Sequence, residues 1–195
     1  MLAKLVRKDT KMEKKLEKNW SHHSSIGLAT YLKKMKGTIR QEAKVDYIDS
    51  IISAVGALIA IITVSFMAIH LGYPMALAPL GASCILVFGA HKGALSQPRH
   101  VVGGHLLATT FAIIIWCLLG KSLFTLGLVL ALVLILMVLT QTMHPPAAAS
   151  ALVAVNNQVG WGFLIPVLLG SLLIVVISII YNNLFQSRQY PNHWL

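Results

Sequence analysis

Long uninterrupted runs of apolar residues dominate the sequence after residue 45. Four of these runs, at residues 48–70, 101–119, 122–140 and 162–181, are each about 20 residues long and carry almost no charge. A helix rises ~1.5 Å per residue, so each run is long enough to cross the ~30 Å hydrocarbon core of a bilayer. The pattern predicts an all-α polytopic membrane protein with four long transmembrane helices.

Two shorter apolar runs lie between the long ones. The first, MALAPLGASCILVFGA, covers residues 75–90, and the second covers residues 146–155, just before a polar Asn-Asn-Gln. Both are too short for an ordinary membrane span, and such segments are typically re-entrant, broken or buried half-helices. We therefore expect two short or broken membrane helices beside the four long ones.

The two short runs resemble each other when the sequence is shifted by 67 residues. The shift aligns Pro79, Ala82 and Ser83 with Pro146, Ala149 and Ser150, and Gly103 with Gly170. It also places the first long run over the third, which indicates two repeats, at about 48–119 and 121–182. If the short helices cross the bilayer, the second repeat is inverted; if they are re-entrant, the repeats are parallel.

Positive charge is concentrated at the start of the chain. Residues 1–44 hold twelve Lys/Arg and four Asp/Glu, a net +8 of the total +10. Basic segments next to a span remain in the cytoplasm, so we expect a basic cytoplasmic N-terminal arm, both termini inside, and residence in the cell (inner) membrane. The same rule favours crossing short helices, an inverted 3+3 arrangement, because the loop with Lys92 and Arg99 is then cytoplasmic.

The basic arm and the cysteines limit the partners we expect. Residues 2–20 form a weak amphipathic helix that could contact anionic lipid, while a nucleic-acid partner is not expected for an arm tethered to a membrane body. Cys84 and Cys117 lie inside apolar runs and are interpreted as core residues. We find no metal-ligand spacing, acid–base dyad or nucleophile–base pair, so we expect no metal, no cofactor and no enzymatic activity.

Small residues follow a proline in both short runs. Pro79 and the pair Pro145 and Pro146 are typical of helix starts. The small residues that follow are Gly81, Ala82 and Ser83 in the first run, and Ala147, Ala148 and Ser150 in the second. A helix start has unpaired N–H donors and about half a positive charge, which favours an anion. Tight packing between helices is the alternative explanation for these residues.

Three polar residues stand near these helix starts. His144 could donate to an anion or shuttle a proton, or it could be an interfacial residue that orders the turn. Arg99 could stand at the mouth of a pathway or mark the membrane boundary. His105 could line a pathway or be a hydrogen-bonded structural histidine. Asp46 and Asp49 are expected to cap the first long helix.

Several motifs resemble those of the HPP family of integral membrane proteins. The signature segment is TMHPPAAASAL, and the other matching segments are APLGASCILVFGA, SQPRHVVGGH, NNLFQSRQYPNHW and YLKKMKG. His100 stands where the family usually has Asn, and Ala148 where Gly is common. The resemblance runs from about residue 31 to 194. Together with the charge pattern it predicts a basic arm at 1–44, an HPP transmembrane domain at 45–185 and a C-terminal tail at 186–195.

The resemblance also implies a function, because characterised members in plastids and cyanobacteria are associated with nitrite transport. We therefore expect a transporter or channel for a small inorganic anion, with nitrite as the best candidate. The ion is expected between the starts of the two short helices, and the protein is expected to form homo-oligomers in the bilayer. The alternative is a membrane-embedded binding or assembly protein that uses its basic arm.

Overall fold

The computed structural model describes residues 27–36 and 46–194. Contacts divide the chain into two units, Met1–Lys44 and Val45–Leu195. In the first unit, helix α2 spans Leu28–Met35, and Lys33 and Lys34 lie in its last turn, where cations complement the helix dipole. The amphipathic helix expected at residues 2–20 lies outside the described residues.

The second unit is built from helices, and its described residues contain no strand. In chain order its elements are α3 (Tyr47–His70), η1 (Pro74–Ala76), α4 (Leu77–Gly89), η2 (Ala94–Ser96), α5 (Pro98–Leu119), α6 (Leu123–Leu139), α7 (Pro145–Asn156), η3 (Trp161–Phe163) and α8 (Leu164–Asn182). The expected all-α fold is confirmed for these residues.

Within residues 27–36 and 46–194, three helices are long and apolar enough to cross a membrane, rather than the four expected. They are Tyr47–His70, Pro98–Leu119 and Trp161–Asn182. The fourth, α6, has 17 residues, at the lower end of the lengths that span a bilayer. It is short because Ser122 caps its start by accepting from the N–H of Thr125 at 3.0 Å, and because Gln141 adopts a positive φ of 55° just after its end.

Local sequence signals explain where the short helices begin. Helix α7 starts at Pro145, as expected from the proline pair. Helix α4 starts at Leu77, so Pro79 lies in its first turn and the 3-10 turn at Pro74 precedes it. At the start of α3, the Asp46 carboxylate accepts the N–H of Asp49 at 3.0 Å, which confirms Asp46 as the cap.

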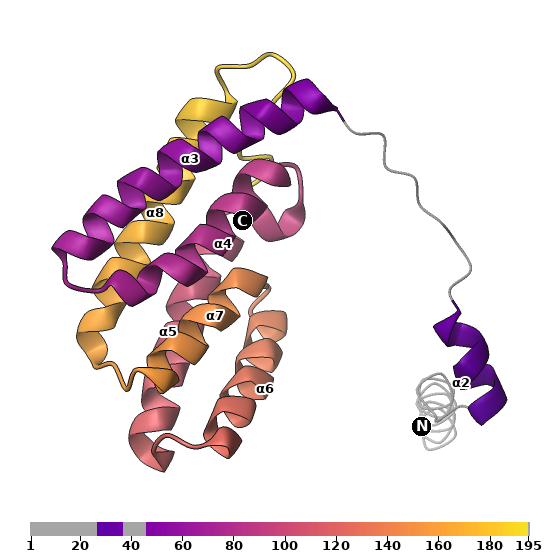
Figure 1. Cartoon of the computed structure of the whole chain (residues 1–195), viewed down its shortest axis with the longest axis vertical. Coiled ribbons are helices and arrows are strands. Elements are labelled where there is room, and N and C mark those ends of the chain that lie inside the picture. The colour runs from indigo at the N-terminus through magenta and orange to yellow at the C-terminus, as the bar shows by residue number, and fades with distance from the viewer. Residues whose placement is uncertain (1–26, 37–45, 195) are drawn as a thin grey trace, which may run out of the picture. The chain divides into compact units, whose positions relative to one another are not determined.

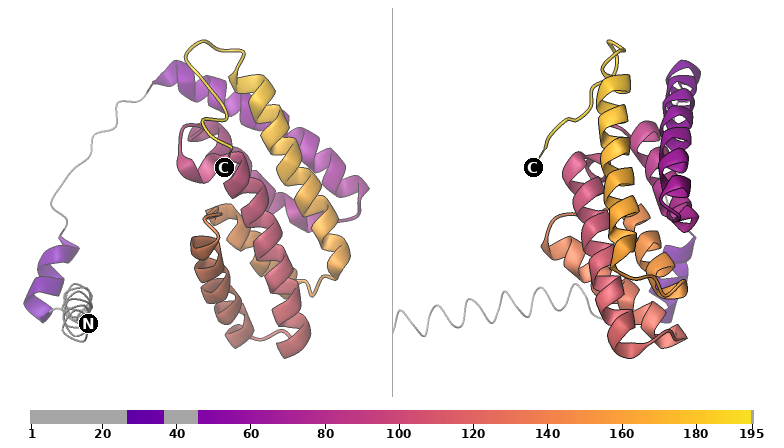
Figure 2. Two further views of the ribbon diagram at one scale, coloured as in Figure 1. Left: turned by 180° about the vertical axis from the view of Figure 1, so that it is seen from behind. Right: turned by 90° about the vertical axis from the view of Figure 1, so that its left-hand side faces the viewer.

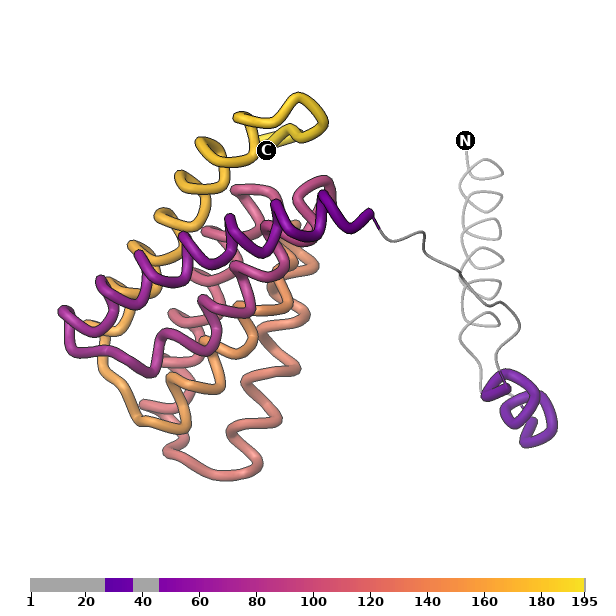
Figure 3. The backbone as a smooth tube through the Cα atoms, turned by 45° about the horizontal axis from the view of Figure 1, so that its top comes forward, coloured from indigo at the N-terminus to yellow at the C-terminus, as the bar shows by residue number. Residues whose placement is uncertain are grey.

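Successive helices from α3 to α8 alternate in direction (Figures 1 and 3). The two short helices lie inside this arrangement, where α4 contacts α3, α8 and α7, and α7 contacts α5, α6 and α4. Figure 1 shows α7 between α5 and α6, and Figure 2 shows α8 beside α3 from behind. The short helices therefore form the centre of the unit, with α4 packed against α3 and α8 and α7 packed against α5 and α6.

The outward faces of the bundle are apolar. Large side chains such as Ile62 on α3, Leu134 on α6 and Ile180 on α8 are more than half exposed. A monomeric protein in water rarely exposes so much contiguous apolar surface, whereas lipid chains cover it without cost. Together with the length of the helices, this surface identifies an integral membrane protein.

Candidate functional site

Four polar side chains are buried together where α4, α5 and α7 meet. Ser83 comes from the middle of α4, His105 from the second turn of α5, His144 from the residue before α7, and Ser150 from α7 itself. The exposed fraction of each residue is 0%. We call these four residues the His/Ser cluster.

The His/Ser cluster is a continuous chain of hydrogen bonds. The Oγ atom of Ser83 lies 2.7 Å from Nε2 of His105 and 2.9 Å from Nε2 of His144. The other ring nitrogen of His105 lies 2.8 Å from Oγ of Ser150, and that of His144 lies 2.8 Å from the carbonyl oxygen of Leu95. The two rings meet edge to face, with centroids 5.2 Å apart.

A glycine in α5 allows this close approach. A Cβ atom built on Gly104 would lie 2.8 Å from both the Cβ of His144 and the carbonyl oxygen of Thr142. Real Cβ atoms do not approach a backbone oxygen so closely, so only glycine lets α5 contact the start of α7 at this depth. The Gly-Gly-His stretch thus places His105 beside the His-Pro-Pro stretch.

The structure brings together the two histidines and two serines that the sequence singled out, but it places the other candidates elsewhere. Ala147 is buried beside Gly104, and Pro146 is buried as well. Pro145 and Ala148 line an apolar hollow of about 310 Å³ with side chains of α6. Gly81 is half-buried near Ile61, and Ala82 faces outward.

Arg99 and His100 lie outside the His/Ser cluster, at the first turn of α5. Nη2 of Arg99 donates to the carbonyl oxygen of Thr140 at 2.9 Å, and Nδ1 of His100 lies 2.9 Å from the carbonyl oxygen of Met143. Both side chains therefore hold the segment that joins α6 to α7. That segment carries His144, so they help to fix where its ring lies.

We expected an anion site between the starts of the two short helices. The directions of the helices show that these starts do not meet. Tyr73, before α4, packs on Phe163, after α7, whereas His144, before α7, contacts Leu95, after α4. The two helices are therefore antiparallel, and their amino ends lie at opposite ends of the bundle (Figure 1). Backbone donors at the start of α7 are also few, because two prolines lack an N–H and that of Ala147 donates to the carbonyl oxygen of His144.

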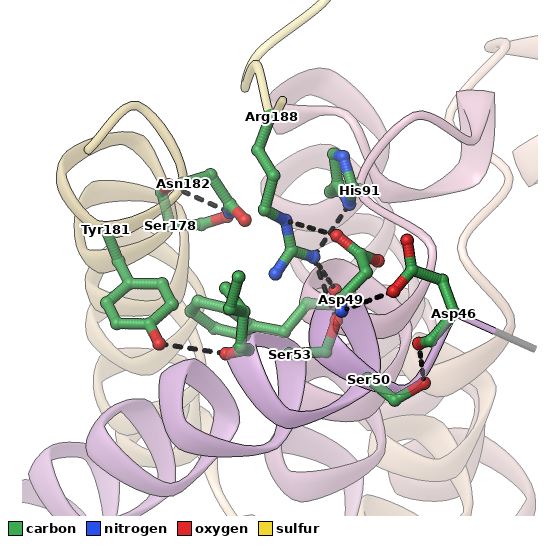
Figure 4. Close-up of polar contacts among 11 residues, drawn as sticks. Asp46, Asp49, Ser50, Ser53, His91, Ser178, Tyr181, Asn182 and Arg188 are labelled. Carbon is green, nitrogen blue, oxygen red and sulfur yellow. Dashed lines mark hydrogen bonds and ion pairs between the residues drawn. The ribbon is translucent and has the colours of Figure 1, made fainter. Parts of the chain in front are cut away.

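A second polar group, which the sequence analysis missed, lies at the end of the bundle where the described part of the chain finishes. Figure 4 shows Arg188 reaching between α3 and the turn after α4. Its Nη2 donates to the carbonyl oxygen of Phe88 at 2.7 Å and to Oγ of Ser53 at 2.9 Å, and lies 2.9 Å from Nδ1 of His91. Its Nε lies 3.5 Å from the carboxylate of Asp49.

Electrostatics in this second group follow from the guanidinium. Arg188 can only donate, so Nδ1 of His91 accepts and the neutral ring carries its hydrogen on Nε2. Burial lowers the pKa of His91 from its usual 6.5, and the charge of Arg188 lowers it further. Asp49 was expected to cap α3. It lies in the first turn of that helix, and its carboxylate also pairs with Arg188.

The segment after α8 is tied down by further contacts to the turn between α4 and α5. The hydroxyl of Tyr190 donates to the carbonyl oxygen of Ser96 at 2.8 Å, and the N–H of Asn192 donates to Oε1 of Gln97 at 2.9 Å. This turn contains Leu95, whose carbonyl oxygen accepts from His144. The C-terminal segment therefore supports one end of the His/Ser cluster.

Comparison with known families agrees with the motifs. A family described as HPP, transmembrane region, matches residues 42–191. The chain belongs to the HPP transmembrane family. This match covers both short helices and the C-terminal segment, and it confirms the resemblance seen in the sequence.

Relatives with a curated description give no function. Two proteins of Dictyostelium discoideum, both named transmembrane proteins, are 35% identical over 127 residues and 32% identical over 122 residues. The alignments cover 60% and 58% of this chain, and 41% and 43% of the relatives. The chain thus spans about two fifths of the length of these relatives. No solved structure matches the chain.

Proposed function

We propose that the chain forms a transporter that carries a small inorganic anion across the membrane. The observation that supports this is the His/Ser cluster, a fully buried chain of imidazoles and hydroxyls inside a membrane-spanning bundle. Ionisable residues at membrane depth are costly to bury, so they commonly mark a path for a substrate or a proton. Nitrite is the first substrate to test, because of the function associated with the HPP proteins that the motifs resemble.

The chemistry of the cluster suits a small ion of single charge. Its side chains are imidazoles and hydroxyls without a fixed charge, so an anion of single charge would not be held too tightly to leave. The walls are made of small residues, including Gly104 and Ala147. Such a site has little room for an organic substrate.

We infer further that the six helices of the bundle are two inverted units. The shift of 67 residues carries α4 (77–89) to 144–156, beside α7 (145–156), and carries η2 (94–96) onto η3 (161–163). The two units are α3–α5 and α6–α8, and their helix contacts correspond. The contact of α4 with α8 matches that of α7 with α5, and the contact of α3 with α8 matches that of α6 with α5. Inverted repeats of this kind are common in secondary transporters, with the substrate site between the units.

His105 lies between equivalent positions of the two units. Ser83 and Ser150 are related by the 67-residue shift, and each contacts a different nitrogen of this one ring.

The positive-inside rule places the end with Lys92, Arg99 and Arg188 in the cytoplasm. On this basis the described C-terminal end faces the cytoplasm, and we propose the cell (inner) membrane as the location of the chain.

Uptake of isotope-labelled nitrite into proteoliposomes tests the proposal. We expect Ser83→Ala, His105→Gln and His144→Gln each to slow protein-dependent uptake by about tenfold or more, since a loss of about 1.4 kcal/mol of transition-state stabilisation gives that factor. The matched control is Ser171→Ala, because Ser171 is equally buried but its hydroxyl donates only to Leu168 of its own helix.

The same assay separates transport from the alternative role in assembly. Deletion of residues 1–30 leaves uptake unchanged if the bundle transports, whereas an assembly protein that acts through its basic arm loses its function in cells. Uptake that stays at the wild-type rate in the combined Ser83→Ala, His105→Gln, His144→Gln variant would exclude the His/Ser cluster as the site.

A further inference from the structure

We propose that the His/Ser cluster binds one proton together with each anion, so that the protein moves the two together with no net charge. This inference rests on the proposed transport function and adds the coupling ion to it. It is carried by the direction of the hydrogen bonds in the cluster and by the absence of acidic residues from the helices that surround it.

The hydrogen atoms of the cluster can be placed from its acceptors. The carbonyl oxygen of Leu95 only accepts, so Nδ1 of His144 carries a hydrogen and, in the neutral ring, Nε2 is an acceptor. Ser83 must then donate its hydroxyl hydrogen to that Nε2 atom. Nε2 of His105 must in turn donate to Oγ of Ser83, and Nδ1 of His105 accepts from Ser150.

With both rings neutral, every hydrogen in this chain therefore points the same way, from Ser150 through His105 and Ser83 to His144 and Leu95. The opposite tautomer of His105 would use the hydroxyl hydrogen of Ser83 and leave Nε2 of His144 as a buried acceptor with no donor. Such an atom is costly at this depth. A chain of uniform direction is the arrangement along which a proton can pass from group to group.

Ser83 also has a second acceptor that accommodates an added proton. Its Oγ lies 3.2 Å from the carbonyl oxygen of Pro79, one turn earlier in α4. When a proton from water adds to the lone pair of Nε2 in His144, the new N–H donates to Oγ of Ser83, and the serine hydrogen rotates to Pro79. The imidazolium that forms then keeps all its hydrogen bonds, and loss of the proton reverses each step.

From residue 45 onward, the chain places no acidic side chain beside that imidazolium. From residue 45 onward the only acidic residues are Asp46 and Asp49, both at the start of α3. Asp46 caps that helix and Asp49 pairs with Arg188 at the end of the bundle. Helices α4 to α8, which surround the His/Ser cluster, contain no Asp or Glu.

The other titratable groups near the cluster do not change this balance. Arg99 and His100, on the first turn of α5, hold carbonyl oxygens of the segment before α7, and Lys92 and Lys121 are exposed. Cys84, beside Ser83 in α4, is buried and is neutral as a thiol. A proton in the cluster is thus a buried, unpaired charge, which is strongly unfavourable unless an anion enters with it.

A nearby hydroxyl offers an additional donor for that anion. Thr109 lies one turn beyond His105 in α5, its exposed fraction is 0%, and its Oγ1 has no hydrogen-bond partner among the described residues. A buried hydroxyl without a partner is uncommon and indicates an unmet interaction. The ligand class that fits is a monovalent oxyanion, because its charge balances one proton and an acceptor oxygen can take the hydroxyl hydrogen of Thr109.

The experiment measures nitrite and proton movement in the same proteoliposomes. The full-length protein is reconstituted with a trapped pH-sensitive dye, an inward proton gradient is imposed, and the membrane potential is set with potassium and valinomycin. Protein-free liposomes measure the nitrous acid that crosses the lipid by itself, and this background is subtracted. We expect protein-dependent nitrite uptake with one proton per nitrite, at a rate that does not change with membrane potential.

The outcomes separate the two proposals. Protein-dependent nitrite uptake that follows the membrane potential and brings no protons would overturn the coupling and leave the transport function standing. No protein-dependent nitrite movement, under any gradient, would overturn both. The wild-type measurement does not depend on whether any variant folds.

A histidine variant adds a second readout. His144→Gln keeps a side chain that can donate and accept but cannot take up a proton, so we expect it to lose the stimulation by the proton gradient. The Ser171→Ala control keeps the full stimulation. A His144→Gln variant that is stimulated by the gradient as strongly as wild type would also overturn the coupling.

Discussion

At the scale of single residues, Ser83 satisfies two buried ring nitrogens at once. Ser83→Ala removes the hydroxyl that donates to Nε2 of His144 and that accepts the N–H of His105. Each buried group left without a partner costs about 1–3 kcal/mol. We therefore expect the free energy of unfolding in detergent to fall by at least about 1 kcal/mol. Ser171→Ala is the matched control and should change it by much less, because its hydroxyl donates only within its own helix. Equal losses for the two variants would contradict the hydrogen-bond chain.

His91 makes stability depend on pH in a direction that follows from its environment. Its pKa is lowered from 6.5 in the folded protein by burial and by Arg188, although Asp49 opposes the shift. The unfolded chain therefore binds more protons near pH 6, so stability is full above about 6.5 and is lost as the pH falls toward the lower folded pKa. Denaturant titrations of wild type and His91→Gln between pH 7.5 and 5 measure this loss, which should be smaller in the variant. Identical slopes would contradict the burial of a neutral ring.

The residues of the site differ in how far the sequence could reveal them. His144 stands out because it directly precedes the proline pair. Ser83 stands out because it lies one turn after Pro79 in a short apolar run. The bonds of Ser83 to His144 and to His105 could not be predicted, since they join residues 61 and 22 positions apart and depend on how three helices pack. The role of Arg188 was missed because it lies beyond the last apolar run. In the sequence it is an isolated cation within a family motif, and nothing there indicates its partners.

At the scale of elements, the contact between α5 and α7 depends on a single missing side chain. Gly104→Ala would place a Cβ atom 2.8 Å from the carbonyl oxygen of Thr142, and a backbone atom cannot move aside cheaply. We expect a loss of about 1–3 kcal/mol of stability, as for other overpacked cores. It should be seen as a lower unfolding midpoint in detergent.

Gly127→Ala provides the control for this contact. Gly127 is also inside a helix, α6, but a Cβ atom there would meet nothing within 4 Å. Alanine favours the helix over glycine by about 1 kcal/mol, so the control should be neutral or slightly stabilising. If both variants behave alike, the close approach of α5 and α7 is not what holds His144 in place.

Helix positions were largely predictable, whereas the places where the ends of the short helices lie were not. The apolar runs and the prolines located α3, α5, α7 and α8 closely, because burial in lipid requires long stretches without charge. Whether the short helices cross or turn back depends on how their ends pack. That is why the expected meeting of two amino ends was wrong, although the serines of both helices do converge on His105.

At the scale of the whole molecule, the alternating direction of helices α3 to α8 predicts which loops share a side of the membrane. Lys92, after α4, and Ser187, after α8, lie at the same end of the bundle and line one open hollow of about 520 Å³. Lys121, between α5 and α6, bonds to the carbonyl oxygen of Asn156 at the end of α7, which is the other end. All three residues are exposed, so each can be replaced by a cysteine that reagents can reach.

Single cysteines at these positions distinguish crossing helices from re-entrant ones. The two natural cysteines, Cys84 and Cys117, are first replaced by alanine and serine, and labelling is done with a reagent that does not cross the membrane. We expect Lys92→Cys and Ser187→Cys to react from one side and Lys121→Cys from the other. Re-entrant short helices would reverse this result, because they would put the loop with Lys92 on the side opposite Ser187 and bring Lys121 to the side of Ser187. Since the inverted relation of the two units requires that both short helices cross, the reversed pattern would also remove the symmetry that places His105 between equivalent serines.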